Sequence, residues 1–128
     1  MNIITYQEKN EETLAGTLAR RIKDAREGAS FKIGNRGFKI LKISEMFDKK
    51  KVKLSQNISF SEKNGIIEIV CNGQKIKFNF AKKVLSLAGN GIEMKKRYGS
   101  ADSLEKALKK VIKTISEKGR LDFHISLA

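Results

Sequence analysis

Hydrophobic and polar residues alternate most clearly in residues 56–80, as three short runs separated by Asn-Gly pairs at 64–65 and 72–73. Asn-Gly pairs accept the positive φ angles of tight hairpin turns, so this segment predicts a three-stranded antiparallel meander. In the last run, Lys75 and Lys77 fall on the polar face and the apolar residues fall on the other. The middle run is apolar on both faces, which predicts that it is the central strand of the three.

Residues 10–27 show the spacing of an amphipathic helix. Asn10 is the expected N-cap, because its side chain can accept a hydrogen bond from the free amides of the first turn. Gly28 is the expected end, since glycine tolerates the left-handed conformation that often follows a helix. Basic residues in the second half of this helix are explained by the helix dipole rather than by a binding site.

Residues 102–118 predict a second and longer helix, with an unbroken apolar stripe along one side and lysines along the other. Asp102 is its expected cap, Glu105 completes a variant of the capping box, and Gly119 ends it. A stripe of this kind also suits a helix lying on a membrane surface. Because further strands surround the helix, the stripe is expected to cover the apolar face of a sheet.

Further strands are predicted on either side of the meander. Residues 30–43 and 81–98 each read as a hairpin, with turns at 34–37 and 89–91. Residues 121–127 alternate as a final strand, and residues 2–6 also match a short strand. The sequence therefore predicts an α+β fold, with a mainly antiparallel sheet of about six to eight strands and two amphipathic helices covering one face. No proline or linker interrupts it, so residues 1–128 are expected to form one domain.

The segment between Ser44 and Leu54 fits either a helical turn or the start of a strand. It contains three consecutive lysines, Lys49, Lys50 and Lys51. Burying an unpaired ammonium group costs several kcal/mol, so three in a row cannot all face a core. They are expected in an exposed basic loop or at a helix end.

The chain is strongly basic, with 27 Lys and Arg against 14 Asp and Glu, a net charge of +13. The excess lies in residues 30–53 and 74–120, on either side of a nearly neutral stretch. This balance favours a polyanionic partner such as nucleic acid or an acidic protein. A lysine-rich composition of the source genome is the alternative explanation.

The sequence has no apolar run long enough to span a membrane and no signal peptide at its start. One cysteine cannot form an internal disulfide, which agrees with a reducing compartment. A soluble protein of the cytoplasm is therefore expected. No phosphate loop or dinucleotide motif is present, so no cofactor and no small-molecule substrate are indicated.

Catalytic chemistry has little support in the residues. Cys71 has no companion for a metal or redox site and is expected to be a small buried hydrophobe. His124 is the only histidine, too few for a metal site. Asp122 and His124 share a strand face, an arrangement considered for a small nuclease, but no nucleophile or carboxylate cluster completes such a site. The chain is therefore expected not to be an enzyme.

These observations predict a non-enzymatic nucleic-acid-binding protein that contacts the phosphate backbone largely independently of sequence. Lysines outnumber arginines more than threefold, and lysine acts as a point charge on phosphates, whereas arginine favours base reading. The expected contact surface lies where residues 74–80 meet the other basic segments. Its candidate residues are Arg36, Lys49, Lys50, Lys51, Lys53, Lys75, Lys77, Lys82, Lys83, Lys95, Lys96 and Arg97.

DNA and RNA, single- or double-stranded, fit this pattern equally well. The signatures of RNA-recognition motifs are absent, and the order of elements exceeds a simple double-stranded-RNA-binding domain. The alternative function is a small basic interaction or inhibitor protein that docks on an acidic protein partner.

Overall fold

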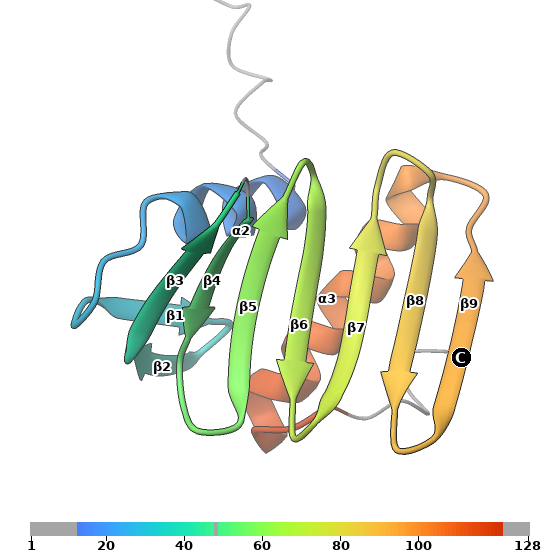
Figure 1. The fold of residues 1–128 in the computed structure, drawn as a ribbon. Helices are drawn as coiled ribbons and strands as arrows, with labels where there is room; N and C mark the ends of the chain where they lie inside the picture. The colour runs from blue at the N-terminus through green and yellow to red at the C-terminus, as the bar shows by residue number, and fades with distance from the viewer. Residues whose placement is uncertain (1–12, 48, 122–128) are drawn as a thin grey trace, which may run out of the picture.

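The computed structural model describes residues 13–47 and 49–121, which form two helices and nine strands (Figure 1). The helices are α2 (Leu14–Lys23) and α3 (Ala101–Lys118). Two strands, β1 (Ser30–Ile33) and β2 (Arg36–Lys39), form a hairpin of their own. The other seven form one sheet: β3 (Lys42–Met46), β4 (Lys49–Lys53), β5 (Ile58–Lys63), β6 (Ile66–Cys71), β7 (Gln74–Asn79), β8 (Val84–Gly89) and β9 (Ile92–Arg97).

The seven-stranded sheet is an antiparallel meander in which each strand pairs with the next one along the chain. Three of its hairpins close through two-residue Asn-Gly loops, at 64–65, 72–73 and 90–91, and both residues of each loop have positive φ angles. The predicted turns are thus confirmed. Strand β6 lies between β5 and β7, as its two-sided apolar pattern predicted.

One face of this sheet carries the core. Helices α2 and α3 and the β1–β2 hairpin all lie behind the sheet in Figure 1, and α3 crosses behind its central strands. Phe60, Ile69 and Ile76 are fully buried on this side, in adjacent strands. Phe31 of β1 packs on Phe60, with ring centroids 6.0 Å apart. The predicted α+β arrangement, an antiparallel sheet with two helices on one face, is confirmed.

Helix α3 matches its prediction except at the N-cap. The apolar stripe is buried along its whole length, and Gly119 ends the helix with a φ angle of 70°. Ser100, not Asp102, caps it, because the Ser100 hydroxyl accepts a hydrogen bond of 3.2 Å from the amide of Ser103. Asp102 instead lies in the first turn, where the helix dipole favours a negative charge.

Glu105 does not complete a capping box. Its carboxylate accepts hydrogen bonds from the amides of Leu14 and Ala15, the first two residues of α2. Amides at a helix N-terminus lack partners within the helix, so a carboxylate from another element stabilises that end. These two hydrogen bonds join the helices through residues that are 91 and 90 positions apart in the sequence. The local pattern around Glu105 could not reveal them.

Helix α2 is shorter than residues 10–27. Asn10, the expected cap, lies outside the described residues, and the helix begins after Thr13, whose side chain accepts a hydrogen bond of 3.0 Å from the amide of Gly16. The helix ends at Lys23 rather than near Gly28. The Lys50 ammonium donates to the carbonyls of Lys23 and Ala25, which satisfies backbone acceptors at this end.

Residues 30–46 form strands in two different sheets, which corrects the single hairpin predicted for 30–43. The amide of Ile40 donates to the carbonyl of Ala29, whereas the amide of Leu41 donates to the carbonyl of Lys53. The chain therefore passes from the small hairpin to the large sheet between residues 40 and 41. Backbone pairing with distant residues decides this break, and the apolar pattern continues through it.

The exposed loop or helix end predicted for Lys49, Lys50 and Lys51 is wrong, because these residues form strand β4. Consecutive residues of a strand point to opposite faces, so Lys49 and Lys51 point to one face and Lys50 to the other. The three adjacent lysines can therefore lie in a strand without all facing the core.

The strands predicted at residues 2–6 and 121–127 fall wholly or almost wholly outside the described residues, as do Asp122 and His124. Over residues 13–47 and 49–121, neither helix has the length and apolar character needed to cross a membrane.

Candidate functional site

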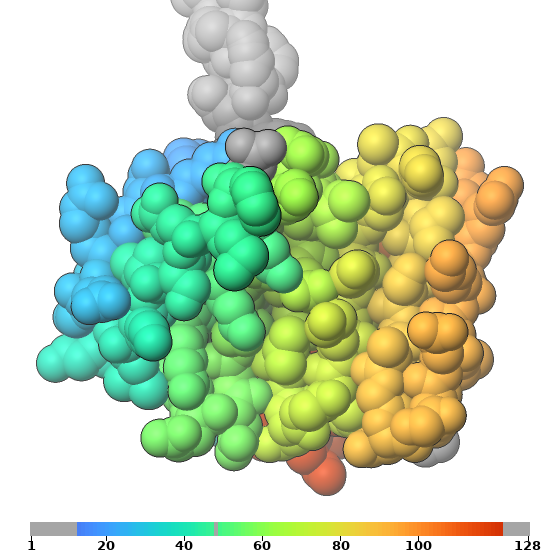
Figure 2. All heavy atoms as spheres, in the orientation of Figure 1, coloured from blue at the N-terminus to red at the C-terminus, as the bar shows by residue number. Residues whose placement is uncertain are grey.

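The sheet face opposite the helices is uncovered, and side chains of β3 to β9 form almost all of it (Figure 2). Cross-strand pairs place nine basic side chains on this open face against two acidic ones, Glu68 and Glu93. Small residues, Ser59, Ser61 and Ser86, lie between them. The basic residues of the open face are Lys42, Lys49, Lys51, Lys53, Lys63, Lys75, Lys77, Lys95 and Arg97.

Strand β4 supplies one column of this charge. Lys49, Lys51 and Lys53 occupy alternate positions and therefore point to the open face, about 6.8 Å apart along the strand. Val52, between two of them, is fully buried on the helix side and holds the strand in this register. Lys50 also points to the helix side, so of the four β4 lysines predicted as contacts it is the one turned away.

Strands β7 and β9 supply the second group. Lys75 and Lys77 are exposed, as their alternation with the buried Ile76 predicted. Lys95 and Arg97 are exposed on the same face. Lys96 points to the other face, and its ammonium group lies 5.1 Å from the centre of the Tyr98 ring.

The basic residues predicted as contacts in 95–97 are therefore divided between the two faces of the sheet. Lys82 and Lys83 lie in the turn between β7 and β8, at the end of the sheet where β9 finishes. The amide of Tyr98 donates to the Lys83 carbonyl, which places Lys83 beside the end of β9. Both lysines are exposed, so this turn extends the basic surface beyond the strands.

Arg36 lies apart from the open face. It is in the β1–β2 hairpin, on the helix side of the sheet, and its Nε donates to the carbonyl of Ser116 in α3 at 3.2 Å. Its guanidinium also lies 6.0 Å from the centre of the Phe38 ring. The structure thus gives Arg36 a role in joining the hairpin to α3, and does not bring it together with the lysines of the open face.

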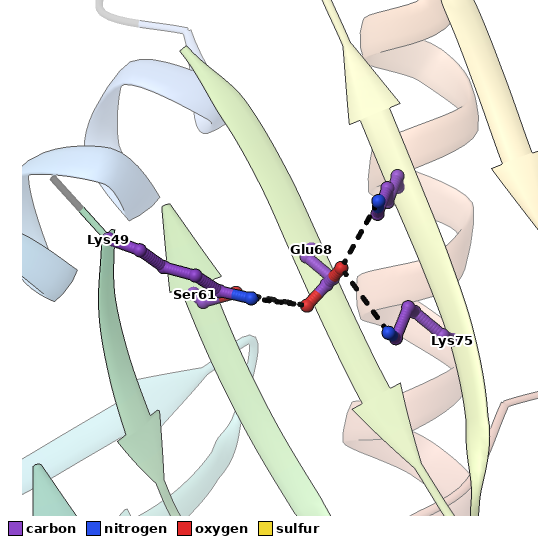
Figure 3. A network of polar contacts seen from close by, with 5 residues as sticks. Lys49, Ser61, Glu68 and Lys75 are labelled. Atoms are coloured by element: carbon purple, nitrogen blue, oxygen red, sulfur yellow. Dashed lines mark hydrogen bonds and ion pairs between the residues drawn. The ribbon is translucent and has the colours of Figure 1, made fainter. Parts of the chain in front are cut away.

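Glu68 lies among the lysines of the open face and contacts three of them. Its Oε1 accepts a hydrogen bond of 3.1 Å from Lys49, and its Oε2 lies 3.7 Å from Lys77 and 3.9 Å from Lys75 (Figure 3). The Ser61 hydroxyl donates to the same carboxylate at 3.4 Å. These side chains come from four adjacent strands, and those of the lysines cover the Glu68 side chain, which is 9% exposed.

Two effects act on the pKa of Glu68. Burial raises it, but the hydrogen bond from Lys49 and the charges of Lys49, Lys75 and Lys77 together outweigh burial, so the pKa lies below its ordinary value. Glu68 is therefore ionised at neutral pH. It balances one charge and holds the three lysines along the middle of the open face.

Replacing Glu68 by glutamine should lower the free energy of unfolding at pH 7 by about 1–3 kcal/mol. A carboxyl with a lowered pKa in the fold stabilises it above the pKa of the unfolded chain, near 4.3, and this contribution is lost as the pH falls through the folded pKa. The stability difference between wild type and Glu68→Gln should therefore shrink below about pH 4. Urea unfolding of both proteins at several pH values from 7 to 3 measures this difference in the free energy of unfolding. Glu93→Gln, at an exposed carboxylate of the same face, is the control. A constant difference across this range would contradict the role of Glu68.

Two shallow hollows interrupt the open face. One, of about 380 Å³, is lined by residues of β7, β8 and β9, with Lys75, Lys77 and Lys95 around it. The other, of about 260 Å³, is lined by residues of β4, β5 and β6 and of the loops that follow β4 and β6, with Lys51 and Lys53 beside it. Each hollow places ammonium groups around a space open to solvent, an arrangement that suits phosphate groups.

Sequence reasoning missed Lys42 and Lys63, which also point to the open face, and the part played by Glu68. Alternation within residues 42–46 and 58–63 was the signal for the two lysines, once the pairing of the strands is known. The predicted contact surface, where residues 74–80 meet the other basic segments, is also more divided than expected. Strands β5 and β6 lie between β4 and β7, and β8 lies between β7 and β9.

Two features considered as possible chemistry can be located in the structure, the cysteine and the groups of potential metal ligands. Cys71 is fully buried, and burial raises the pKa of its thiol, so it has the character of the predicted small hydrophobe. Within residues 13–47 and 49–121, no three side chains of His, Cys, Asp or Glu are grouped to hold a metal ion.

Comparison with known proteins found no matching family model, no matching curated protein and no matching solved structure. The arrangement of side chains on the open face is therefore what supports a function.

Proposed function

We propose that the protein binds nucleic acid without catalysis, contacting the phosphate backbone through the open face of the seven-stranded sheet. The observation that carries this proposal is the charge of that face, where nine Lys and Arg side chains stand against two carboxylates. Glu68 is already paired within the face, and both helices of the described part of the chain lie on the other side of the sheet. Basic surfaces of this kind attract polyanions and raise their local concentration.

The type of charge favours backbone contacts over base reading. Eight of the nine basic residues on the open face are lysines, and Arg97 is the exception. An ammonium group contacts a phosphate as a point charge, whereas base edges are read by planar groups that donate two hydrogen bonds at once. Binding is therefore expected to depend little on base sequence.

Salt dependence tests this proposal. If about six of these side chains each neutralise one phosphate, the logarithm of the association constant should fall against the logarithm of salt concentration with a slope of about −5 for duplex DNA and −4 for single strands. Fluorescence anisotropy with labelled oligonucleotides across 50–200 mM salt, about the range in which such contacts lose most affinity, measures this slope. A slope near zero, or no binding at low salt, would reject the proposal.

The same face would also attract an acidic protein. A capture experiment distinguishes nucleic acid from an acidic protein as the partner. The protein is used to capture partners from a cell extract with and without prior nuclease treatment. Capture that disappears after nuclease treatment supports nucleic acid, and an acidic protein retained at unchanged yield supports the alternative.

A further inference from the structure

Phe47 is an unusual residue at one end of the open face. It follows strand β3 in the tight connection to β4, where Met46 pairs with Lys49. Its side chain is 92% exposed and that of its neighbour Met46 is 68% exposed. An aromatic ring in full contact with water contributes nothing to the core, so packing does not explain why phenylalanine occupies this position.

The backbone at Phe47 is also unfavourable for its side chain. Its φ angle is +56°, a region in which a bulky residue is an outlier. The hairpins β5–β6, β6–β7 and β8–β9 have an asparagine at the equivalent first loop position, with φ angles of 49°, 55° and 53° at Asn64, Asn72 and Asn90. Asparagine tolerates this conformation well, because its short polar side chain bonds to the nearby backbone.

The first loop position after the strand therefore has a positive φ angle in all four hairpins, with asparagine in three of them and an exposed phenylalanine in the fourth. Unfavourable backbone conformations of this kind are retained where a function requires the side chain. Phe47 lies next to the β4 lysine column, and Lys63 of the neighbouring strand β5 points to the open face at the same end. Phe47 thus follows the open face at the end where Lys49 and Lys63 point outward, and a polyanion bound along the face would reach this end.

Among the described residues of the open face itself, none is aromatic. The face can therefore hold phosphates but has no ring of its own on which a base could stack. Phe47 supplies that missing element at the end of the face.

We propose that Phe47 stacks on an unpaired nucleobase, so that the ligand of the open face is single-stranded nucleic acid. This inference rests on the proposed function and names the class of ligand. Bases in a duplex are already stacked on their neighbours, whereas an unpaired base offers its face to an aromatic ring regardless of its identity. In such a complex the phosphates contact the lysines of the open face. One base at the end of the face turns away from its neighbours in the nucleic acid and stacks on the ring of Phe47.

Phe47→Asn tests the stacking, because it removes the ring and places in the loop the residue that the three other hairpins use. We expect this variant to be at least as stable as wild type towards urea. It should bind a dT oligonucleotide about tenfold or more weakly than wild type, since stacking on one base contributes this much. Wild type should bind dT more tightly than an oligonucleotide of abasic residues of equal length, and Phe47→Asn should bind the two equally.

The outcomes separate this inference from the proposed function. If wild type binds neither oligonucleotide at low salt, both are overturned. If wild type binds dT and the abasic strand equally, and Phe47→Asn changes neither, the open face binds phosphates but Phe47 does not stack.

Phe47→Trp gives a direct signal, because the chain contains no tryptophan. It should retain the affinity of wild type for dT, and its fluorescence should be quenched when a base stacks on the indole. Unchanged emission with dT would reject the stacking. A blue shift with vesicles of anionic lipid, without quenching by dT, would overturn the proposal in favour of a membrane surface.

Discussion

Replacing Lys51, Lys53 and Lys95 together by glutamate should weaken nucleic-acid binding by about 100-fold or more at low salt. These three lysines lie in the two basic groups of the open face, on β4 and β9, and none takes part in the contacts of Glu68. The substitution turns three attractive sites into repulsive ones. The slope of affinity against salt should also become shallower by about 3, one unit for each lost phosphate contact. Anisotropy titrations at several salt concentrations measure both quantities.

A matched control lies on the opposite side of the molecule. Lys106, Lys109 and Lys113 are exposed on α3, away from the sheet. Changing them to glutamate alters the net charge by the same amount, so it tests whether charge alone governs binding. We expect a much smaller loss for this variant. Equal losses in the two variants would show that binding follows the total charge and has no preference for the open face.

Replacing Phe60 by alanine should lower the free energy of unfolding by about 3–5 kcal/mol. Phe60 is fully buried in β5 and touches Phe31, so it joins the sheet to the β1–β2 hairpin as well as filling the core. Its loss leaves a cavity that the surrounding strands cannot close. For a domain whose total stability is about 5–15 kcal/mol, this is a large fraction.

Urea unfolding followed by circular dichroism measures this effect, and Phe47→Ala is the control. The same chemical change at a ring that is 92% exposed should cost almost nothing. A similar loss in both variants would contradict the core position of Phe60.

Much of the fold could be predicted because hydrogen bonds between neighbouring strands follow directly from local turns. The Asn-Gly loops at 64–65, 72–73 and 90–91 join strands that pair with each other, so each hairpin is defined within about fifteen residues of chain. Helix α3 was predictable for the same reason, since its stripe and Gly119 are local signals. Errors occurred where a distant partner decides, as when Glu105 caps α2 and Lys50 binds carbonyls at the end of that helix.

The candidate site was predicted only in part. Lys75 and Lys77 were assigned to the polar face correctly, because buried residues on both sides mark the alternation. In β4 only Val52 marks the apolar side, and four lysines around it obscured the strand. Lys50 and Lys96 were grouped with the other cations by closeness in sequence, and Arg36 was chosen as the tip of a predicted hairpin, but all three lie on the helix side. Alternation moves adjacent residues to opposite faces, so closeness along a strand does not mean a shared surface.

The sequence by itself determined the hairpins, the two amphipathic helices and the excess of positive charge. The tertiary structure decided which face of the sheet the helices cover, and therefore which lysines are left exposed together. The physical reason is that the apolar side chains of β4 to β8 must be buried beneath α2 and α3, and this burial turns the alternate residues outward. The open face, with Glu68 at its centre and Phe47 at its end, is the consequence of that packing.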